Sequence, residues 1–294
     1  MAMTSKPQLA FILSLPRSGS TVLTAQLDRI EGVACAPESS FPQILGHLTR
    51  SERHDPQRLA ALYLSSTFTP TPLDLQEAAV CMAGTDEEIL TSLGLAVVAK
   101  LGRDPQRVRV VVWKTPRTVG MLAAPLGTRG KFVIIRRNLH NVYESQFRVD
   151  FGENNRKPFR FAVFRESYEH AFARIPADRK MEIDYEQLPG ILPQVAAFLG
   201  INEMKAWSQG CSNLEMAAAT RTHMSEVTSE FHNHDAEKRA RLDPAQVRAL
   251  DKALAMARPL RPFLGAVRSY FDRQSLGHIR QRVADVARNA TRTP

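Results

Sequence analysis

Residues 9–21, with the sequence LAFILSLPRSGST, decide the fold that we expect for this chain. Residues 9–15 form the first long apolar run, which is too short to cross a membrane and which we interpret as a buried strand. The turn that follows contains Gly19 and several hydroxyl side chains, and a helical pattern begins after it. Because a strand, a tight turn and a helix start together present backbone N–H groups, the stretch predicts an anion-binding loop.

This loop differs from the phosphate loop of kinases and ATPases. That loop requires the pattern Gly-x-x-x-x-Gly-Lys-Ser/Thr, and here both the first glycine and the lysine are absent. The sequence therefore favours an anion other than a magnesium-bound nucleotide. An ordinary strand-to-helix turn remains the structural alternative, because short turns of serine and glycine are common.

Short apolar runs alternate with longer amphipathic ones along the rest of the chain. Residues 108–113, 131–135 and 180–183 are predicted strands, and apolar residues recur at helical spacing over 161–175. Asp-Pro pairs at 55–56, 104–105 and 243–244 predict helix starts. Strands that alternate with helices pair in parallel, so we expect an α/β fold with a central parallel sheet flanked by helices. In such sheets, ligands bind beyond the carboxyl ends of the strands.

Composition and length set the outline of the domain. The 294 residues are 44% hydrophobic and 23% charged, which excludes a disordered or fibrous chain. We expect an N-terminal leader over 1–8, one domain over 9–265 and a basic C-terminal tail over 266–294 that forms a helix. That helix could pack on the domain, or it could lie on a membrane surface or bind a partner. The three cysteines form no Cys-x-x-Cys pair, which favours a reducing, cytoplasmic location over a disulfide framework.

The positive charge of the chain is concentrated in one block. The formal net charge is +9, and residues 100–137 contain ten basic side chains and one acidic one. Such a block predicts an anionic partner, which could be a nucleic acid, an anionic membrane, a phosphorylated cofactor or an acidic peptide.

A second candidate anion site follows the run at 131–135. If Asn138 caps a helix, Ser145 lies on its polar face, and Arg137 stands beside that face at the end of the strand. A guanidinium and a hydroxyl that converge in this way suit a phosphate monoester. The alternative is a solvated helix start.

Two such loops, in this order, resemble the sulfotransferases that use 3′-phosphoadenosine 5′-phosphosulfate (PAPS). Residues 16–21 look like the 5′-phosphosulfate loop of that family, Arg137 and Ser145 match its 3′-phosphate motif, and residues 184–188 (DYEQL) are similar to its Tyr-Glu-x-Leu strand end. The resemblance covers about residues 9–265. It implies a P-loop-like sulfotransferase fold, PAPS as cofactor, adenosine 3′,5′-bisphosphate as product and no metal. The cofactor-binding residues that it implies are Arg17, Ser18, Gly19, Ser20, Thr21, Arg137, Ser145 and Tyr185.

Within the family, the chain looks most like a soluble, bacterial relative of the tyrosylprotein branch. That branch carries an arginine at the position of Arg17, a general-base glutamate at the interval of Glu38 and a Lys-x-Pro like that at Lys114. The resemblance implies these three as catalytic residues and a tyrosine, in an acidic peptide or protein, as the acceptor. The alternatives are a carbohydrate, lipid or small-metabolite hydroxyl as acceptor, a kinase-like phosphotransferase, and a basic nucleic-acid-binding module without enzymatic activity.

Several features of the chain depart from the family pattern or are open. Val149 stands where the family has a further arginine after the serine. For the late cofactor contacts of the family, Ser225, Thr228 and Lys238 are the candidates. The histidines of the polar stretch at 223–234 lack a convincingly spaced third ligand for zinc. A homodimer is left open, and no nucleic-acid partner is expected.

Overall fold

A single parallel sheet forms the centre of the described part of the protein. The computed structural model describes residues 6–115, 122–148, 157–188, 190–211 and 235–264, together with residues 277 and 281. Within these residues the strands are β1 (Gln8–Ser14), β2 (Val33–Cys35), β3 (Val110–Lys114), β4 (Lys131–Arg136) and β5 (Lys180–Asp184). They form a five-stranded sheet in the order β2-β3-β1-β4-β5, and every neighbouring pair is parallel. The predicted α/β class with a parallel sheet is confirmed.

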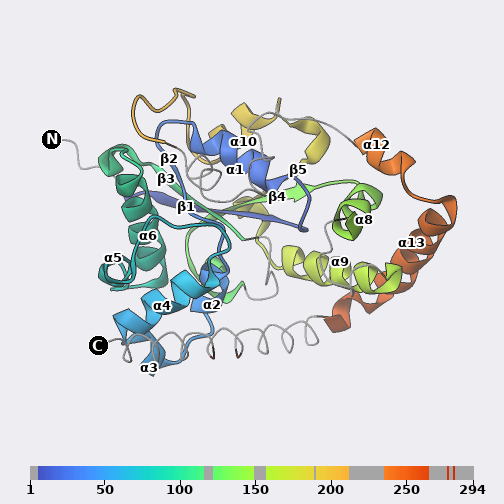
Figure 1. Ribbon diagram of the computed structural model, residues 1–294, viewed down its shortest axis with the longest axis horizontal. Coiled ribbons are helices and arrows are strands. Elements are labelled where there is room, and N and C mark those ends of the chain that lie inside the picture. The colour runs from blue at the N-terminus through green and yellow to red at the C-terminus, as the bar shows by residue number, and fades with distance from the viewer. Residues whose placement is uncertain are drawn as a thin grey trace.

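Helices connect the strands, as parallel pairing requires. The α-helices are α1 (Ser20–Asp28), α2 (Phe41–Leu45), α3 (Arg50–Arg53), α4 (Pro56–Ser66), α5 (Leu75–Val80), α6 (Asp86–Lys100), α7 (Ala123–Gly127), α8 (Leu139–Arg148), α9 (Pro158–Ala173), α10 (Leu192–Phe198), α12 (Asp235–Ala240) and α13 (Pro244–Ala257). Short 3₁₀ turns are η1 (Pro105–Arg107), η3 (Ala177–Arg179), η4 (Tyr185–Gln187) and η6 (Arg258–Leu260). Figure 1 shows α12 and α13 beyond α8 and α9, on the side away from the sheet.

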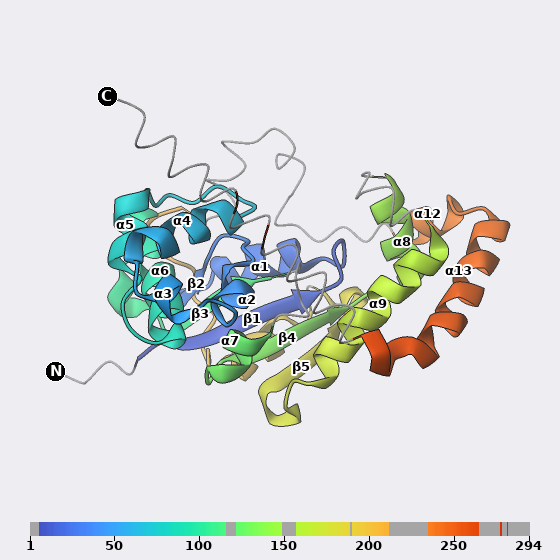
Figure 2. The ribbon, with the colours of Figure 1, turned by 90° about the horizontal axis from the view of Figure 1, so that it is seen from below.

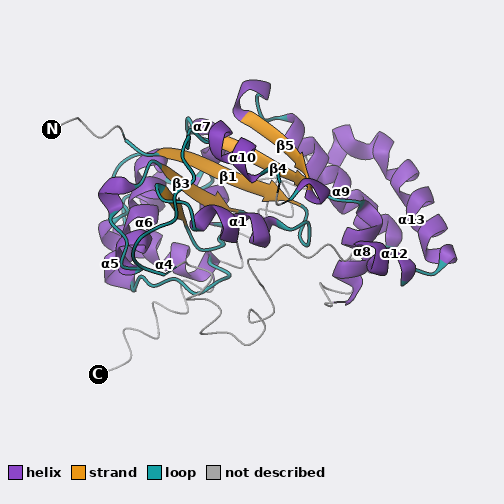
Figure 3. Cartoon of the chain, turned by 90° about the horizontal axis from the view of Figure 1, so that it is seen from above, coloured by secondary structure: helices purple, strands orange, loops and turns teal. Residues whose placement is uncertain are grey.

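Both faces of the sheet are buried at β1 to β4, which explains why these strands are almost continuously apolar, whereas the edge strand β5 is partly exposed. Alternate β1 side chains enter two separate cores, with Phe11 in one and Ile12 in the other. The Ile12 core includes residues of α1 and α10, which lie over the face seen in Figure 3. The Phe11 core includes residues of α2, α4, α6, α8 and α9, and Figure 2 shows α2 over this opposite face. The loops that follow β1, β3 and β4 therefore start from strands that are packed on both faces.

The predicted strands agree with the observed ones to within one or two residues, and β1 starts at Gln8, one residue before the expected domain boundary. Strand β2 was missed, because three residues are too few to show a pattern. Of the Asp-Pro pairs, those at 55–56 and 243–244 begin α4 and α13, where the aspartate accepts a hydrogen bond from a backbone N–H of the first turn. The pair at 104–105 begins only a 3₁₀ turn.

Two expected features fall largely or partly beyond the described residues. The leader over 1–8 is described only from residue 6, and of the tail over 266–294 only residues 277 and 281 are described. In the described part of the chain, none of the helices combines the length and the apolar character needed to span a bilayer.

Candidate active site

The loop after β1 has an unusual backbone conformation. Ser18 N–H donates to Leu15 O (3.2 Å), which closes a tight turn, and Gly19 precedes α1 with a φ of 90°. Arg17 has a φ of 75°, a left-handed conformation that bulky side chains rarely adopt. Such strain persists only where the surroundings enforce it, and it is concentrated at functional sites. The first N–H groups of α1, which have no partner within the helix, begin at this loop.

Gly19 is required for a second reason, which is the close approach of Tyr185. A Cβ atom at position 19 would lie 2.4 Å from both Cδ2 and Cε2 of the Tyr185 ring. Tyr185 follows β5 and is 5% exposed, so its ring packs on the backbone of the β1 loop. Burial raises the pKa of its hydroxyl, although the nearby Arg137 acts in the opposite direction.

Three predicted site residues meet at the carboxyl edge of the sheet. Lys114, the last residue of β3, donates from Nζ to Thr21 Oγ1 and to Glu38 Oε2, each at 2.6 Å. The side chains of Lys114 and Glu38 are 7% and 17% exposed. Parallel strands end at one edge, and β1 and β3 are neighbours with Ile12 opposite Lys114. The sheet register therefore brings the β1 loop and Lys114 together.

The position of Glu38 is set by its own backbone. Its N–H donates to Thr69 Oγ1 (2.9 Å), and its carbonyl accepts from the N–H of Phe68 (2.7 Å). The next residue, Ser39, donates from its N–H to Lys114 O (3.4 Å). The segment after β2 is thus held between β3 and the chain that follows α4, and the Glu38 carboxylate is directed at the ammonium group of Lys114.

The second motif is joined to the first by direct hydrogen bonds. Arg17 Nε donates to Ser145 Oγ (3.1 Å), Arg137 Nη1 donates to Arg17 O (2.9 Å), and Gln146 Nε2 donates to Pro16 O (2.9 Å). Asn138 caps α8 as expected, because its Oδ1 accepts from the N–H of His140 (3.1 Å). The two predicted anion loops therefore lie in direct contact.

Positive charge accumulates where the two loops meet. Burial lowers the pKa of the Arg17 guanidinium, and the neighbouring Arg137 lowers it further. A bound anion between the two would relieve that repulsion. The electrostatics therefore favour an anionic ligand at this point.

The guanidinium of Arg137 is bound by Asp235, a residue that the sequence did not indicate. Arg137 Nε lies 3.1 Å from Asp235 Oδ1 and 3.3 Å from Oδ2, and Nη2 also bonds to Oδ1. The guanidinium lies over the Tyr185 ring, with 3.8 Å between its Cζ and the ring centroid. Asp235 is 98 residues away in the chain, and nothing in the sequence around it marks a contact with the sheet.

The late candidates have different outcomes. Lys238 is on α12, the helix that begins with Asp235, and its pKa is lowered by burial and by the proximity of Arg137 and Arg17. It therefore lies near the site. Ser225 and Thr228 lie outside the described residues, as do Val149 and the histidines of the stretch at 223–234.

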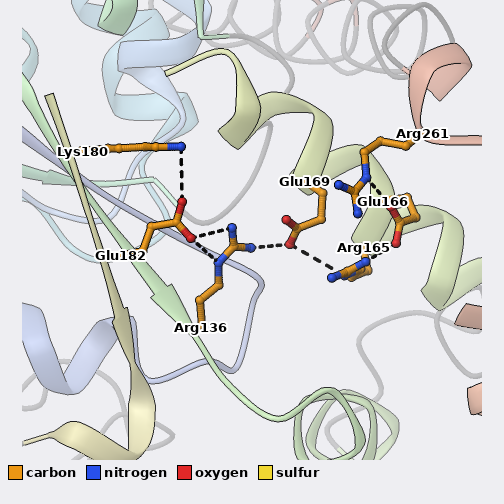
Figure 4. A network of polar contacts seen from close by, with 7 residues as sticks. All are labelled: Arg136, Arg165, Glu166, Glu169, Lys180, Glu182 and Arg261. Atoms are coloured by element: carbon orange, nitrogen blue, oxygen red, sulfur yellow. Dashed lines mark hydrogen bonds and ion pairs between the residues drawn. The ribbon is translucent and has the colours of Figure 1, made fainter. Parts of the chain in front are cut away.

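Arg136 belongs to a separate network behind the site (Figure 4). Its guanidinium bonds to Glu182 of β5 (Nη2 to Oε2, 2.9 Å) and to Glu169 of α9. The network continues through Arg165 to the buried Glu166, which Arg261 also contacts (2.6 Å). A cavity of about 220 Å³ lies between this network and the site, and its lining includes Leu15, Ser18, Arg137, Arg165 and Phe172.

The basic block at 100–137 is largely neutralised within the protein. Of its nine basic residues that the structure describes, six form ion pairs with acidic side chains: Lys100 with Glu77, Arg103 with Asp28, Arg107 with Glu31, Lys114 with Glu38, Arg136 with Glu169 and Glu182, and Arg137 with Asp235. Arg103 is 5% exposed, so its charge is neutralised by Asp28 inside the protein. These ion pairs therefore leave less of the positive charge of the block free for an external anion than its sequence alone indicates.

Comparison with known proteins identifies the family. The model of the sulfotransferase family matches residues 8–205, which contain every predicted catalytic and cofactor-binding residue. This chain therefore belongs to the sulfotransferase family. A comparison with curated protein sequences finds no match.

Several solved structures are similar in fold. The sulfotransferase domain from the Synechococcus PCC 7002 olefin synthase is 20% identical, with a TM-score of 0.48 over 86% of this chain and 95% of that one. Mouse sulfotransferase SULT7A1 complexed with PAP is 14% identical, with a TM-score of 0.45 over 90% of this chain and 89% of that one. The sulfotransferase domain from the curacin biosynthetic pathway is 19% identical, with a TM-score of 0.42 over 79% and 82%.

Proposed function

We propose that the enzyme transfers the sulfuryl group of PAPS to an acceptor hydroxyl, and that the acceptor is a tyrosine in an acidic peptide or protein. The observation that carries this proposal is the contact of Lys114 with both Thr21 and Glu38, beside the Arg17–Ser145 bond. One cluster thus combines a cation, an anion loop and a carboxylate that can accept a proton.

The donor would lie across the two loops. The backbone N–H groups at the start of α1 and the hydroxyls of Ser18, Ser20 and Thr21 suit its 5′-phosphosulfate end. Arg137 and Ser145 suit its 3′-phosphate, since a guanidinium fork and a hydroxyl bind phosphate oxygens. Tyr185, which contacts both loops, would border the nucleotide between them. PAPS supplies the sulfuryl group and a stable leaving group.

The side chains of this protein would carry the transfer in the following way. The acceptor oxygen forms a bond to sulfur while the bond from sulfur to the bridging phosphate oxygen breaks. Lys114 and Arg17 stabilise the negative charge on that oxygen as adenosine 3′,5′-bisphosphate leaves. Glu38 takes the acceptor proton. Because a phenol has a pKa of ~10 and a carboxylic acid one of ~4.3, Glu38 accepts the proton only as the new bond forms.

The tyrosine acceptor is supported by the position of Glu38. The carboxylate follows β2, bonds to the lysine of the Lys-x-Pro segment and has the place that the resemblance to tyrosylprotein sulfotransferases gives the general base. The test is an assay of sulfate transfer from PAPS to an acidic tyrosine-containing peptide, to simple phenols, and to a panel of sugar and lipid alcohols. Preferential transfer to a sugar, lipid or small metabolite would replace the peptide as acceptor and leave the donor unchanged.

A nucleic-acid-binding role has less support than transfer chemistry. Since six of the nine described basic residues of the block at 100–137 are paired within the protein, most of these nine already have a carboxylate partner and would have to exchange it for a phosphate. The distinguishing measurement is the salt dependence of DNA or RNA binding. Salt-steep binding that adenosine 3′,5′-bisphosphate does not displace would favour the nucleic-acid role.

We also propose that the enzyme acts in the cytoplasm. All three cysteines, Cys35, Cys81 and Cys211, carry free thiols, and the first two are buried. Free thiols are the rule in reducing compartments. Fractionation of cells that express the tagged protein tests the location.

A further inference from the structure

Asp235 is bound to Arg137 in the manner in which a ligand would be bound. Both carboxylate oxygens lie within 3.3 Å of Arg137 Nε, and Nη2 completes the fork. The side chains of Arg137 and Asp235 are only 4% and 11% exposed. Arg137 holds the pKa of Asp235 below its usual value, although burial acts against this. The pair is therefore an ionised, largely buried contact.

The remaining groups of Arg137 are also engaged. Nη1 donates to Arg17 O, and the face of the guanidinium lies over Tyr185. The edge formed by Nε and Nη2 is the one that binds a carboxylate or a phosphate in a fork, and it accommodates one such group at a time. A phosphate can therefore bind to this edge only if Asp235 leaves it.

The element that carries Asp235 is placed to respond to such a change. Asp235 is the first residue of α12, a short helix that packs against α8, and α8 carries Ser145. A second link between the two helices is the ion pair of Arg241, just after α12, with Glu144 at 3.7 Å. The contacts of α12 therefore lie beside the proposed 3′-phosphate donors.

We propose that Asp235 is an internal competitor for the 3′-phosphate position, and that it sets the affinity and the selectivity of the site for nucleotides with a 3′-phosphate. This inference rests on the proposed function, which assigns Arg137 to that phosphate. A phosphate monoester carries about −1.5 to −2 charges against −1 for the carboxylate, and it has more acceptor oxygens, so it can displace Asp235. A nucleotide without a 3′-phosphate leaves the Arg137–Asp235 pair in place.

The opposite role for Asp235 would be to orient Arg137 for the ligand. In that case removal of the carboxylate would weaken binding of the bisphosphate, because the guanidinium would lose its support. The two roles thus predict changes of opposite sign, and a binding measurement separates them.

The experiment is calorimetry of adenosine 3′,5′-bisphosphate and of adenosine 5′-phosphate with the full chain, in wild type and in Asp235→Asn. If the carboxylate leaves Arg137 free in about a tenth of the molecules, Asp235→Asn should bind the bisphosphate about 10-fold more tightly. Affinity for the monophosphate should stay within about 2-fold, because its binding does not require the fork. Asp251→Asn is the matched control, since Asp251 bonds to His140 (2.9 Å) near the start of α8 and does not contact Arg137.

Two results would overturn the inference. If wild type prefers the bisphosphate but Asp235→Asn binds it equally or more weakly, the competitor role is wrong and the proposed function stands. If Asp235→Asn, in which the carboxylate no longer competes for the fork, binds both nucleotides with equal affinity, the 3′-phosphate site itself is wrong, and the competitor role falls with it.

A second measurement needs no variant and applies even if Asp235→Asn does not fold. Amide hydrogen exchange of residues 235–240 in wild type should become faster on addition of the bisphosphate, because displacement of Asp235 removes a contact of α12. The monophosphate should leave the exchange unchanged. Unchanged or slower exchange with the bisphosphate would contradict the displacement.

Discussion

Arg17 Nε donates a hydrogen bond of 3.1 Å to Ser145 Oγ, although the two residues are 128 positions apart in the chain. Each belongs to a different strand-to-helix loop, one after β1 and one after β4. Because these strands are neighbours in a parallel sheet, the loops open at the same edge. The bond joins the two loops. It links the loop proposed for the 5′-phosphosulfate end of PAPS to the loop proposed for its 3′-phosphate.

Replacement of Glu38 by glutamine should separate chemistry from binding. The amide keeps the size of the side chain and an oxygen that can accept from Lys114, but it cannot take the acceptor proton. We expect adenosine 3′,5′-bisphosphate affinity to remain close to wild type and turnover to fall by ~10²-fold or more. Steady-state kinetics and calorimetry measure both quantities. The control is Glu203→Gln, on an exposed carboxylate that pairs with Lys205; normal turnover in Glu38→Gln would remove Glu38 from the mechanism.

Replacement of Lys114 by methionine should reduce turnover more than binding. The ammonium group is the cation nearest to Glu38 and Thr21, and loss of one such stabilising group typically costs about 10²- to 10³-fold in turnover. The comparison is with Lys131→Met. Lys131 is the first residue of β4, and its Nζ donates to Phe198 O at the end of α10. Equal turnover in the two variants would argue against a role for Lys114 in charge stabilisation.

Replacement of Gly19 by alanine should lower the stability of the fold. The new Cβ meets the Tyr185 ring at 2.4 Å, and the φ of 90° disfavours any side chain, so we expect a loss of roughly 1–3 kcal/mol in the free energy of unfolding. Urea unfolding measures it. Gly127→Ala, where nothing lies within 4 Å of the added Cβ, should be close to neutral. A loss of the same size at both positions would contradict the proposed steric cause.

Replacement of Ser145 by alanine should weaken the bisphosphate specifically. We expect a loss of about 5-fold for adenosine 3′,5′-bisphosphate, the value of one hydrogen bond, and no change for adenosine 5′-phosphate. Arg137→Ala should show the same selectivity with a larger loss. The control is Ser167→Ala on α9, where the hydroxyl is also buried and donates to Phe164 O at 2.6 Å. Equal losses for both nucleotides would contradict the assignment of the second motif to a 3′-phosphate.

The start of α6 should contribute to acid sensitivity. Glu88 accepts hydrogen bonds from the backbone N–H and the hydroxyl of Thr85, and these, together with Lys6, lower its pKa from 4.5 to about 2. A lowered carboxyl pKa stabilises the fold above pH 4.5, and that contribution is lost as the pH falls from 4.5 towards 2. Urea unfolding between these values should be less pH-dependent in Glu88→Gln than in Glu186→Gln, an exposed control. Identical pH profiles would contradict the capping role.

The sequence predicted the parts of the site that depend on local pattern. The apolar runs indicated four of the five strands, and the order of short motifs indicated where each loop would follow a strand. Parallel topology placed ligand binding beyond the carboxyl ends of the strands, and the family resemblance implied Arg17, Lys114 and Arg137 as site residues. The structure places them there through the contacts of Lys114 with Thr21 and of Arg137 with Arg17.

The parts that were missed depend on distant pairing. Strand β2 has three residues, too few for a period to appear. The basic block at 100–137 indicated an anionic partner, but the sequence did not show that six of its residues pair with carboxylates from other segments. A charge count along the chain cannot report these pairs, because they form only when the segments are packed.

By itself, the stretch LAFILSLPRSGST determined the first strand, the turn and the start of α1, since buried strands, tight turns and helix starts are encoded by neighbouring residues. Only the tertiary structure decided how the charges of this site are partnered: Lys114 with Glu38, and Arg137 with Asp235. The physical reason is that a strand or a turn forms from contacts within a few residues, whereas an ion pair requires two side chains whose positions are set by the packing of the whole sheet.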